Sequence, residues 1–458
     1  MSDENPGGRR ADRTAGPGSV GYGLAVCGAG PAGTGPFVAA ARDGRLDELL
    51  DLGVVMIERR TPGSGGIGHY RIHANSLGNA FLEGVDGIAG GPLGWLAECP
   101  EARQLRAYAH QHPPLSLVGP FLDRVGEAVA GVLRAHPRCT VLTGTAVEEI
   151  DCLPGGGVAI RAVPESSEPV QTVTAARALI AMGADPDDEL RRLDQPLDTL
   201  LGPIRDRTVH ADHLIDHTRR PLTWLLRRIE QTGRLVIVGS SHSAWSVAHM
   251  LYRNELGGDT RGADICMLAR SDIRLLYGSA GEARSEAYPF ADSDICPLSG
   301  RVNRYGGLRG PARDLARATL GLTGEPSPVR IVPLRQTSAD TLREELHRAG
   351  AVVLATGHRA RLPRLRNPHA QDIVPLHANG GTVVNDLGHL VAIDGTTYPQ
   401  FTLYGLGAGL RPSAAIGGEP SFHRRATGVW LYQNHFGSVL TRDLLSTGGR
   451  RAVCELPA

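Results

Sequence analysis

The amino-acid sequence predicts an α/β fold in which one domain is inserted into another. Short apolar strands alternate with helical stretches along the chain, as expected for a parallel sheet covered by helices. A strand, a glycine-containing turn and a helix follow one another from residue 23, and the same order recurs from residue 234. The 458 residues are enough for two such units.

The first of these segments has the glycine spacing of a dinucleotide site. An apolar strand over residues 23–27 leads into Gly28, Gly30 and Gly33, and a helix is expected over residues 32–42. Gly28 permits a tight turn, Gly30 lets the main chain approach a pyrophosphate at the helix N-terminus, and Gly33 allows close packing of helix on strand. This order predicts a dinucleotide site; a glycine-rich turn without function is the alternative.

The neighbouring residues complete this predicted site. Pro31 and Ala32 belong to the helix N-terminus that would face the pyrophosphate. The next apolar strand, residues 53–57, ends in Glu58, whose carboxylate can accept hydrogen bonds from both ribose hydroxyls. Gly183 follows the strand that closes the first unit, and we include it among the cofactor-binding candidates.

The second strand–turn–helix segment departs from the glycine pattern. Gly239 fits the first position, but Ser241 stands at the second and Ala244 at the third. Serine narrows the approach to the phosphates, and its hydroxyl could contact one. Arg270, after the following strand, suits the 2′-phosphate of NADPH better than an acidic residue would. NADH binding, or a degenerate turn that binds no nucleotide, are the alternatives.

Together the two segments predict two Rossmann-like dinucleotide-binding domains, the NADPH domain inserted in the FAD domain. The expected FAD-binding domain is split between residues 21–190 and 346–458. The expected NAD(P)H-binding domain covers residues 191–345, and residues 1–20 form a disordered tail. Because the second segment offers a separate site for the nicotinamide coenzyme, we expect the first site to bind FAD.

Composition excludes several kinds of chemistry. All 48 basic residues are arginine, so Schiff-base chemistry on lysine is impossible. They balance 48 acidic residues, and no net field would recruit nucleic acid or an acidic membrane. The 7 cysteines form no C-x-x-C pair, which argues against a disulfide scaffold, a zinc site or a dithiol redox pair. Without a membrane-spanning window or a signal peptide, the expected localisation is cytoplasmic.

Several short motifs resemble those of flavin-dependent monooxygenases with FAD and NADPH domains, namely flavin-containing monooxygenases and amine N-hydroxylases. Residues 239–244, which include Ser243, look like the G-x-G-x-S-G/A stretch of that class. Residues 354–358, which include Gly357, look like its A-T-G-Y segment. Residues 70–76 resemble the segment that supplies an asparagine near the flavin.

The resemblance implies a function and a candidate catalytic residue. NADPH would reduce FAD, and oxygen would add to give a C4a-peroxyflavin that hydroxylates a small-molecule amine or another soft heteroatom. Asn75 could hydrogen-bond the distal peroxide or NADP⁺, or it could merely cap a helix over residues 76–82. Molecular oxygen and a small-molecule substrate are the expected partners, and a homo-oligomer is left open.

The sequence departs from the motifs of this class at several positions, and other functions therefore stay open. A ketone-oxygenating fingerprint aligned on His210 would require glycine where Asp206 stands, so that reaction is disfavoured. The segment 403–409 lacks a Gly-Asp pair, although Gly407 could still lie beside FAD. An NAD(P)H-dependent flavin reductase or oxidase without oxygen insertion is the second hypothesis. A flavin-binding regulatory or structural protein is the third.

The histidines offer weaker candidates. The spacing of His210, His213 and His217 would suit one helical face, but a solvated face in a charged connecting region is the preferred interpretation over a metal site. His69 and His73 could contact substrate or simply lie at the edge of the core. Residues 271–325 and the C-terminal hundred residues are expected to supply most of the substrate pocket.

Overall fold

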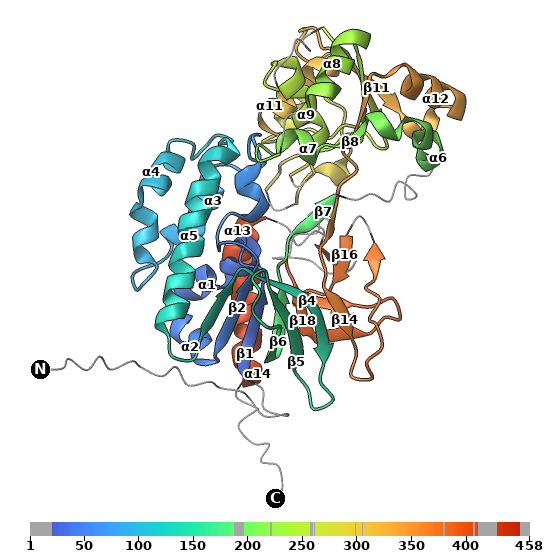
Figure 1. Cartoon of the computed structure of the whole chain (residues 1–458). Coiled ribbons are helices and arrows are strands. Elements are labelled where there is room, and N and C mark those ends of the chain that lie inside the picture. Colours follow the sequence, from blue (N-terminus) through green and yellow to red (C-terminus); the bar gives the residue numbers. More distant parts are fainter. Residues whose placement is uncertain are drawn as a thin grey trace, which may run out of the picture.

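The computed structural model describes residues 21–186, 197–219, 222–256, 260, 262–297, 299–304, 306–378, 381–405, 408–410 and 428–448. The chain has a mixed α/β fold with parallel strands in two large sheets (Figure 1). Within the described part, no helix is both long and apolar enough to cross a bilayer.

The first sheet is built around five parallel strands in the order β3–β2–β1–β6–β18. These strands are β1 (Tyr22–Cys27), β2 (Val54–Glu58), β3 (Thr140–Thr143), β6 (Gln171–Ile180) and β18 (Thr397–Leu403). Most residues of β1 and β2 are buried, which fits their largely apolar sequences. The strands expected at residues 23–27 and 53–57 are present.

Further strands, most of them in antiparallel pairs, extend this sheet to twelve strands. The hairpin of β4 and β5 pairs with the first half of β6, and a meander runs from β18 through β17 and β16 to β15. The added strands are β4 (Thr145–Cys152), β5 (Val158–Pro164), β14 (Arg364–Arg366), β15 (His377–Ala378), β16 (Gly381–Val384), β17 (His389–Val391) and β19 (Ala408–Leu410).

Helices cover the parallel part of this sheet. They are α1 (Pro31–Arg42), α2 (Leu46–Asp51), α3 (Asn79–Asp86), α4 (Pro100–Arg106) and α5 (Leu115–Ala135). The apolar face of α5 recurs at helical spacing and includes the fully buried Val118, Phe121 and Val125. Figure 1 shows α3, α4 and α5 gathered on one flank of the molecule.

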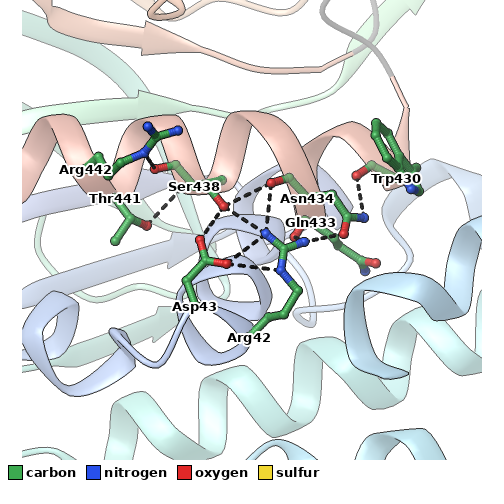
Figure 2. Close-up of polar contacts among 9 residues, drawn as sticks. Arg42, Asp43, Trp430, Gln433, Asn434, Ser438, Thr441 and Arg442 are labelled. Carbon is green, nitrogen blue, oxygen red and sulfur yellow. Dashed lines mark hydrogen bonds and ion pairs between the residues drawn. The ribbon is translucent and has the colours of Figure 1, made fainter. Parts of the chain in front are cut away.

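The last described helix returns to the first one. It comprises α13 (Val429–Leu431), a π-helical turn over Tyr432–Phe436 and α14 (Gly437–Gly448). Arg42, at the end of α1, donates hydrogen bonds to the main-chain oxygens of Gln433 (3.3 Å) and Asn434 (3.1 Å), as Figure 2 shows. A π-turn disrupts the regular carbonyl ladder, and Arg42 satisfies the oxygens that it exposes. The C-terminal segment is thereby fastened to the first βα unit.

The second sheet has five parallel strands in the order β11–β10–β9–β12–β8. They are β8 (Thr208–His210), β9 (Arg234–Val238), β10 (Asp264–Ala269), β11 (Val329–Pro333) and β12 (Ala351–Leu354). Its helices are α6 (Leu197–Leu201), α7 (Asp212–Ile215), α8 (Thr223–Thr232), α9 (His242–Tyr252), α10 (Ala280–Ser285), α11 (Gly310–Thr319) and α12 (Ala339–Arg348). Alternate side chains of β9 enter different apolar clusters, so both faces of the sheet are covered.

The second sheet differs from the sequence expectation in two places. The boundary expected at residues 345/346 falls before β12, yet β12 pairs with β9 and β8 and belongs to the second sheet. The charged connection expected over residues 206–217 contains the edge strand β8 and the helix α7, where Asp212, Leu214 and Ile215 are buried. A three-residue strand is too short to display a periodic pattern.

The chain passes between the sheets through two short strands that pair with each other. Strand β7 (Ala184–Pro186) leaves the first sheet and β13 (His358–Ala360) leaves the second, in antiparallel register. Each follows a glycine with positive φ, +79° at Gly183 and +108° at Gly357. Both passages therefore lie side by side in one ribbon.

Candidate functional site

The three glycines of the first turn have different structural roles. A Cβ at Gly28 (φ +97°) would lie 2.4 Å from the Ala181 oxygen, and a Cβ at Gly33 would lie 2.0 Å from the Gly28 oxygen. Both positions require glycine for packing. A Cβ at Gly30 would meet no atom within 4 Å. Gly30 therefore faces open space, as a residue that admits a ligand would.

The start of α1 has the features of an anion site. Gly30 is the N-cap, Pro31 and Ala32 begin the helix, and neither a side-chain cap nor an acidic residue occupies the first turn. Glu58 lies beside the turn: its carboxylate accepts the main-chain N–H groups of Ala29 (2.6 Å) and Arg60 (2.8 Å). A pyrophosphate at the helix N-terminus and a ribose at Glu58 fit this arrangement.

A glycine-rich loop that the sequence analysis overlooked packs beside this turn. The Gly63 N–H donates to the Ala29 oxygen (2.9 Å), and a Cβ at Gly65 would lie 3.7 Å from the Gly30 Cα. A Cβ at Gly126 of α5 would lie 2.4 Å from the Gly63 Cα, so loop and helix touch backbone to backbone. The run of glycines directly after the second strand was the available signal, because such runs allow close backbone approach.

The second turn repeats the geometry of the first. A Cβ at Gly239 (φ +115°) would lie 2.3 Å from the Ala355 oxygen, matching the contact of Gly28 with the first sheet. Ser241 is the exposed N-cap of α9 and its side chain caps nothing, while Ser243 lies partly buried in the first turn. Arg270 is exposed directly after β10. These residues lie at one carboxyl-terminal edge of the second sheet.

The other predicted cofactor contacts are Gly183, Gly357 and Gly407, and the structure describes the first two of them. Gly183 and Gly357 open the two passages, and a Cβ at either would meet no atom within 4 Å. Gly407 lies outside the described residues.

We call the part of the molecule built on each of the two large sheets a body. Asn75 lies where the two bodies meet, at a contact that we call the junction. Its side chain is exposed, and its main-chain oxygen accepts a 2.8 Å hydrogen bond from Nη1 of Arg309, at the N-cap of α11. The nearby helix α3 begins at Asn79 with Gly78 as N-cap. Asn75 therefore does not cap it, and that alternative is wrong.

Histidines surround this junction. Nε2 of His242, in the first turn of α9, lies 3.5 Å from the His73 main-chain oxygen. Burial lowers the pKa of His242 to about 4, and the positive charges of His112 and Arg309 act in the same direction. Burial likewise lowers the pKa of His112. His242 is therefore a neutral ring near the permanent cation Arg309.

A buried polar cluster joins three segments at the same junction. Asp212 of α7 accepts a hydrogen bond from the Tyr70 hydroxyl (3.2 Å) and lies 3.1 Å from Nε2 of His358 in β13. Burial opposes ionisation of Asp212, but contacts with His358 and Tyr70 hold its pKa below the ordinary value. No sequence pattern pointed to this cluster, because its members are more than a hundred residues apart.

The remaining histidine candidates do not form one face. His210 ends β8, His213 lies in α7, and His217 is exposed beyond it. The ring of His217 meets that of His69 edge to face, with centroids 6.2 Å apart. Across the described ranges, no group of three or more metal-ligating side chains converges.

Comparison with known proteins reveals one relative over nearly the whole chain. The CMP-5'-(3-aminopropyl)phosphonate hydroxylase of Streptomyces rubellomurinus is 38% identical over 441 residues, covering 93% of this chain and 98% of the relative. No protein-family model matches the chain.

Solved structures similar to this one include two ornithine hydroxylases. The ornithine hydroxylase of Pseudomonas aeruginosa has a TM-score of 0.55 at 13% identity, covering 93% of this chain and 99% of that one. The ornithine N-hydroxylase of Kutzneria sp. 744, solved with reduced FAD, NADP⁺ and L-ornithine, has a TM-score of 0.52 at 15% identity, covering 94% and 100%. At such identities these structures establish the fold. The predicted resemblance to amine-hydroxylating flavin monooxygenases is confirmed.

Proposed function

The chain belongs to the family of the Streptomyces rubellomurinus hydroxylase and is an oxidoreductase, and from that premise we propose that it is an FAD- and NADPH-dependent monooxygenase that hydroxylates a primary amine. The substrate class that fits this family is an aminoalkyl phosphonate, free or carried on a nucleotide, as the name of the relative states for that protein. The observation that carries the proposal is the pair of equivalent glycine turns, Gly28 against Ala181 and Gly239 against Ala355.

The first turn supports an FAD site. Gly30 opens onto space at an uncapped helix N-terminus, and Glu58 is held beside it. Main-chain N–H groups and the helix dipole would bind the pyrophosphate, and Glu58 would accept from the ribose. Bound FAD would supply the redox and oxygen chemistry, which no side chain of this protein provides.

The second turn supports an NADPH site. Ser241 and the start of α9 would face the coenzyme phosphates, and the exposed Arg270 would pair with the 2′-phosphate. Gly183 and Gly357 would let the passages lie close to the two cofactors. The same two turns support an arrangement of one Rossmann-like domain inserted in another, in which the chain would return to the first domain after Leu354.

The residues of the junction would position the reactants. Asn75 is exposed where the bodies meet, and Arg309 fixes its main chain, so its amide is available to donate to the coenzyme or to oxygen. The loop at Gly63–Gly65 packs beside the first turn and would help to keep water from the flavin. The substrate amine must reach this point as the neutral nucleophile.

The test is a single-turnover experiment on the FAD-loaded protein. NADPH should bleach the flavin faster than NADH. Oxygen and 3-aminopropylphosphonate should then give a transient absorbance distinct from oxidised and reduced flavin, and an amine product carrying one additional oxygen atom. NADPH oxidation that yields only hydrogen peroxide would instead identify an oxidase or reductase.

A further inference from the structure

The loop that carries Asn75 is held by both bodies of the molecule. We call residues 69–75 the Asn75 loop. On one side the loop forms an isolated β-bridge with the start of α5 in its own body. On the other side it forms a β-bridge with the second body, at Tyr70 and Asp216, in which two main-chain hydrogen bonds are each 2.9 Å long. The position of Asn75 therefore depends on the second body as well as on the first.

Asp212 of α7 ties this bridge to a third segment. Its carboxylate accepts a hydrogen bond from the Tyr70 hydroxyl (3.2 Å) and lies 3.1 Å from Nε2 of His358. His358 directly follows Gly357, the passage glycine that would adjoin the cofactors. One carboxylate thus links the Asn75 loop to the passage between the two sheets.

The electrostatics of this cluster favour a fixed geometry. The side chains of Asp212 and His358 are 10% and 14% exposed. Burial by itself would raise the pKa of Asp212, but the contacts with His358 and Tyr70 hold it below the ordinary value, so the carboxylate is ionised. Burial and the negative charge of Asp212 raise the pKa of Tyr70, so its hydroxyl keeps the proton that it donates. Hydrogen bonds to a buried charged acceptor are strong and directional, and they can hold a loop in one place.

We propose that Asp212 is a positioning residue, which through Tyr70 fixes the Asn75 loop relative to the passage at His358 so that oxygen reaches the substrate amine. This inference rests on the proposed function, in which the Asn75 amide would donate to the coenzyme or to oxygen. A reaction slows steeply when a participating group is displaced by about 1 Å. Release of the loop should therefore divert oxygen from the amine to hydrogen peroxide.

The two fates of oxygen can be counted separately. Each consumes one NADPH, one proton and one oxygen molecule. Hydroxylation gives NADP⁺, water and the hydroxylated amine, whereas uncoupled turnover gives NADP⁺ and hydrogen peroxide. The ratio of hydroxylated amine to hydrogen peroxide, which we call the coupling ratio, therefore reports the placement of the reacting groups and not the affinity for NADPH.

The test compares Tyr70→Phe and Asp212→Ala with the matched control Tyr22→Phe. The control also removes a partly buried tyrosine hydroxyl, which bonds Thr140 (2.9 Å) at the opposite end of β1 from the glycine turn. The coupling ratio is measured on FAD-loaded protein with 3-aminopropylphosphonate. For Tyr70→Phe we expect it to fall by about 10-fold, the factor for one hydrogen bond to a charged group. Its rate of flavin reduction and its KM for NADPH should stay unchanged, and Tyr22→Phe should match the unaltered protein throughout.

A double variant separates positioning from a general loss of structure. If Tyr70 and Asp212 act through one hydrogen bond, Tyr70→Phe combined with Asp212→Ala should lower the coupling ratio no further than Asp212→Ala alone. Additive losses, or a lowered thermal stability with an unchanged coupling ratio, would overturn the inference. Should Asp212→Ala not fold, Tyr70→Phe decides the matter, because it removes a single oxygen atom.

Hydrogen exchange provides a readout without turnover. In Tyr70→Phe, main-chain exchange over residues 69–75 and 215–217 should be faster than in the unaltered protein, and exchange over β9 should not change. If the loop responds in this way but the unaltered protein hydroxylates no amine, the link through Asp212 stands and the proposed function fails. If amines are hydroxylated with the same coupling ratio in every variant, the proposed function stands and the role of Asp212 fails.

Discussion

At the scale of single residues, the glycines divide into those that the fold needs and one that a ligand needs. A Cβ at Gly28 or at Gly33 would overlap a main-chain oxygen, so packing requires glycine at both positions. Gly30 touches nothing and has ordinary backbone angles (φ −70°, ψ −174°) that alanine tolerates. The motif thus contains glycines required for packing and one glycine expected to give a ligand access, and substitutions can distinguish the two roles.

We expect Gly30→Ala to leave stability nearly unchanged while greatly reducing FAD content, because the added methyl would occupy the place of the pyrophosphate. Gly33→Ala should destabilise the protein by about 3 kcal/mol or more, because its Cβ would lie 2.0 Å from a main-chain oxygen. Urea denaturation and the flavin-to-protein absorbance ratio measure the two effects. Gly131→Ala, at an exposed helix position with no neighbour within 4 Å, is the control. Similar behaviour of Gly30→Ala and Gly33→Ala would contradict this division.

At the scale of elements, Arg42 of the first helix is a principal polar contact of the C-terminal helix. The π-turn at Tyr432–Phe436 presents oxygens that Arg42 satisfies, and Ser438 adds a further contact at 2.9 Å. Gly437 meets Ala39 of α1 so closely that a Cβ there would lie 2.5 Å from the Ala39 Cβ. The helix is therefore positioned by tertiary contacts more than by its own propensity.

Arg42→Ala should lower the free energy of unfolding by about 2 kcal/mol, because it leaves the π-turn oxygens without their charged donor. The estimate allows for the partial exposure of the Arg42 side chain, which is 22%. Arg45→Ala removes only a solvent-screened pair with Glu48 and should change the free energy of unfolding far less than Arg42→Ala does. Urea denaturation of both variants provides the comparison, and equal costs would show that the π-turn does not depend on Arg42.

At the scale of the whole molecule, the two bodies are held by polar contacts at one junction. Asp212, Tyr70 and His358 join three segments there, and His242 and Arg309 reach from the second body to the main chain of residues 73–75. Such contacts couple the relative position of the bodies to protonation.

Stability should therefore decline in mild acid. The native pKa of His242 is lowered to about 4 from an ordinary 6.5, so the unfolded chain binds the proton more tightly. The contribution of neutral His242 is complete above pH 6.5 and is lost as the pH falls toward 4, at up to about 1.4 kcal/mol per unit. His242→Gln should flatten the profile of thermal stability between pH 7.5 and 5. His73, His112 and Arg309 face the same ring and remain in the variant. An unchanged profile would refute the assignment.

The sequence by itself determined the two glycine turns and the strands and helices around them, because buried strands and packed helices each require a recognisable local pattern of apolar residues. The strands at 23–27 and 53–57, the strand that begins at residue 234, and the helix after Gly30 could be predicted from local sequence alone. Only the tertiary structure decided that Ala351–Leu354 lies in the second sheet, that Asn75 caps no helix, and that Tyr70, Asp212, His358, His242 and Arg309 meet. Strand pairing and junction contacts join residues far apart in the chain, and no local pattern records which distant partner a side chain will find.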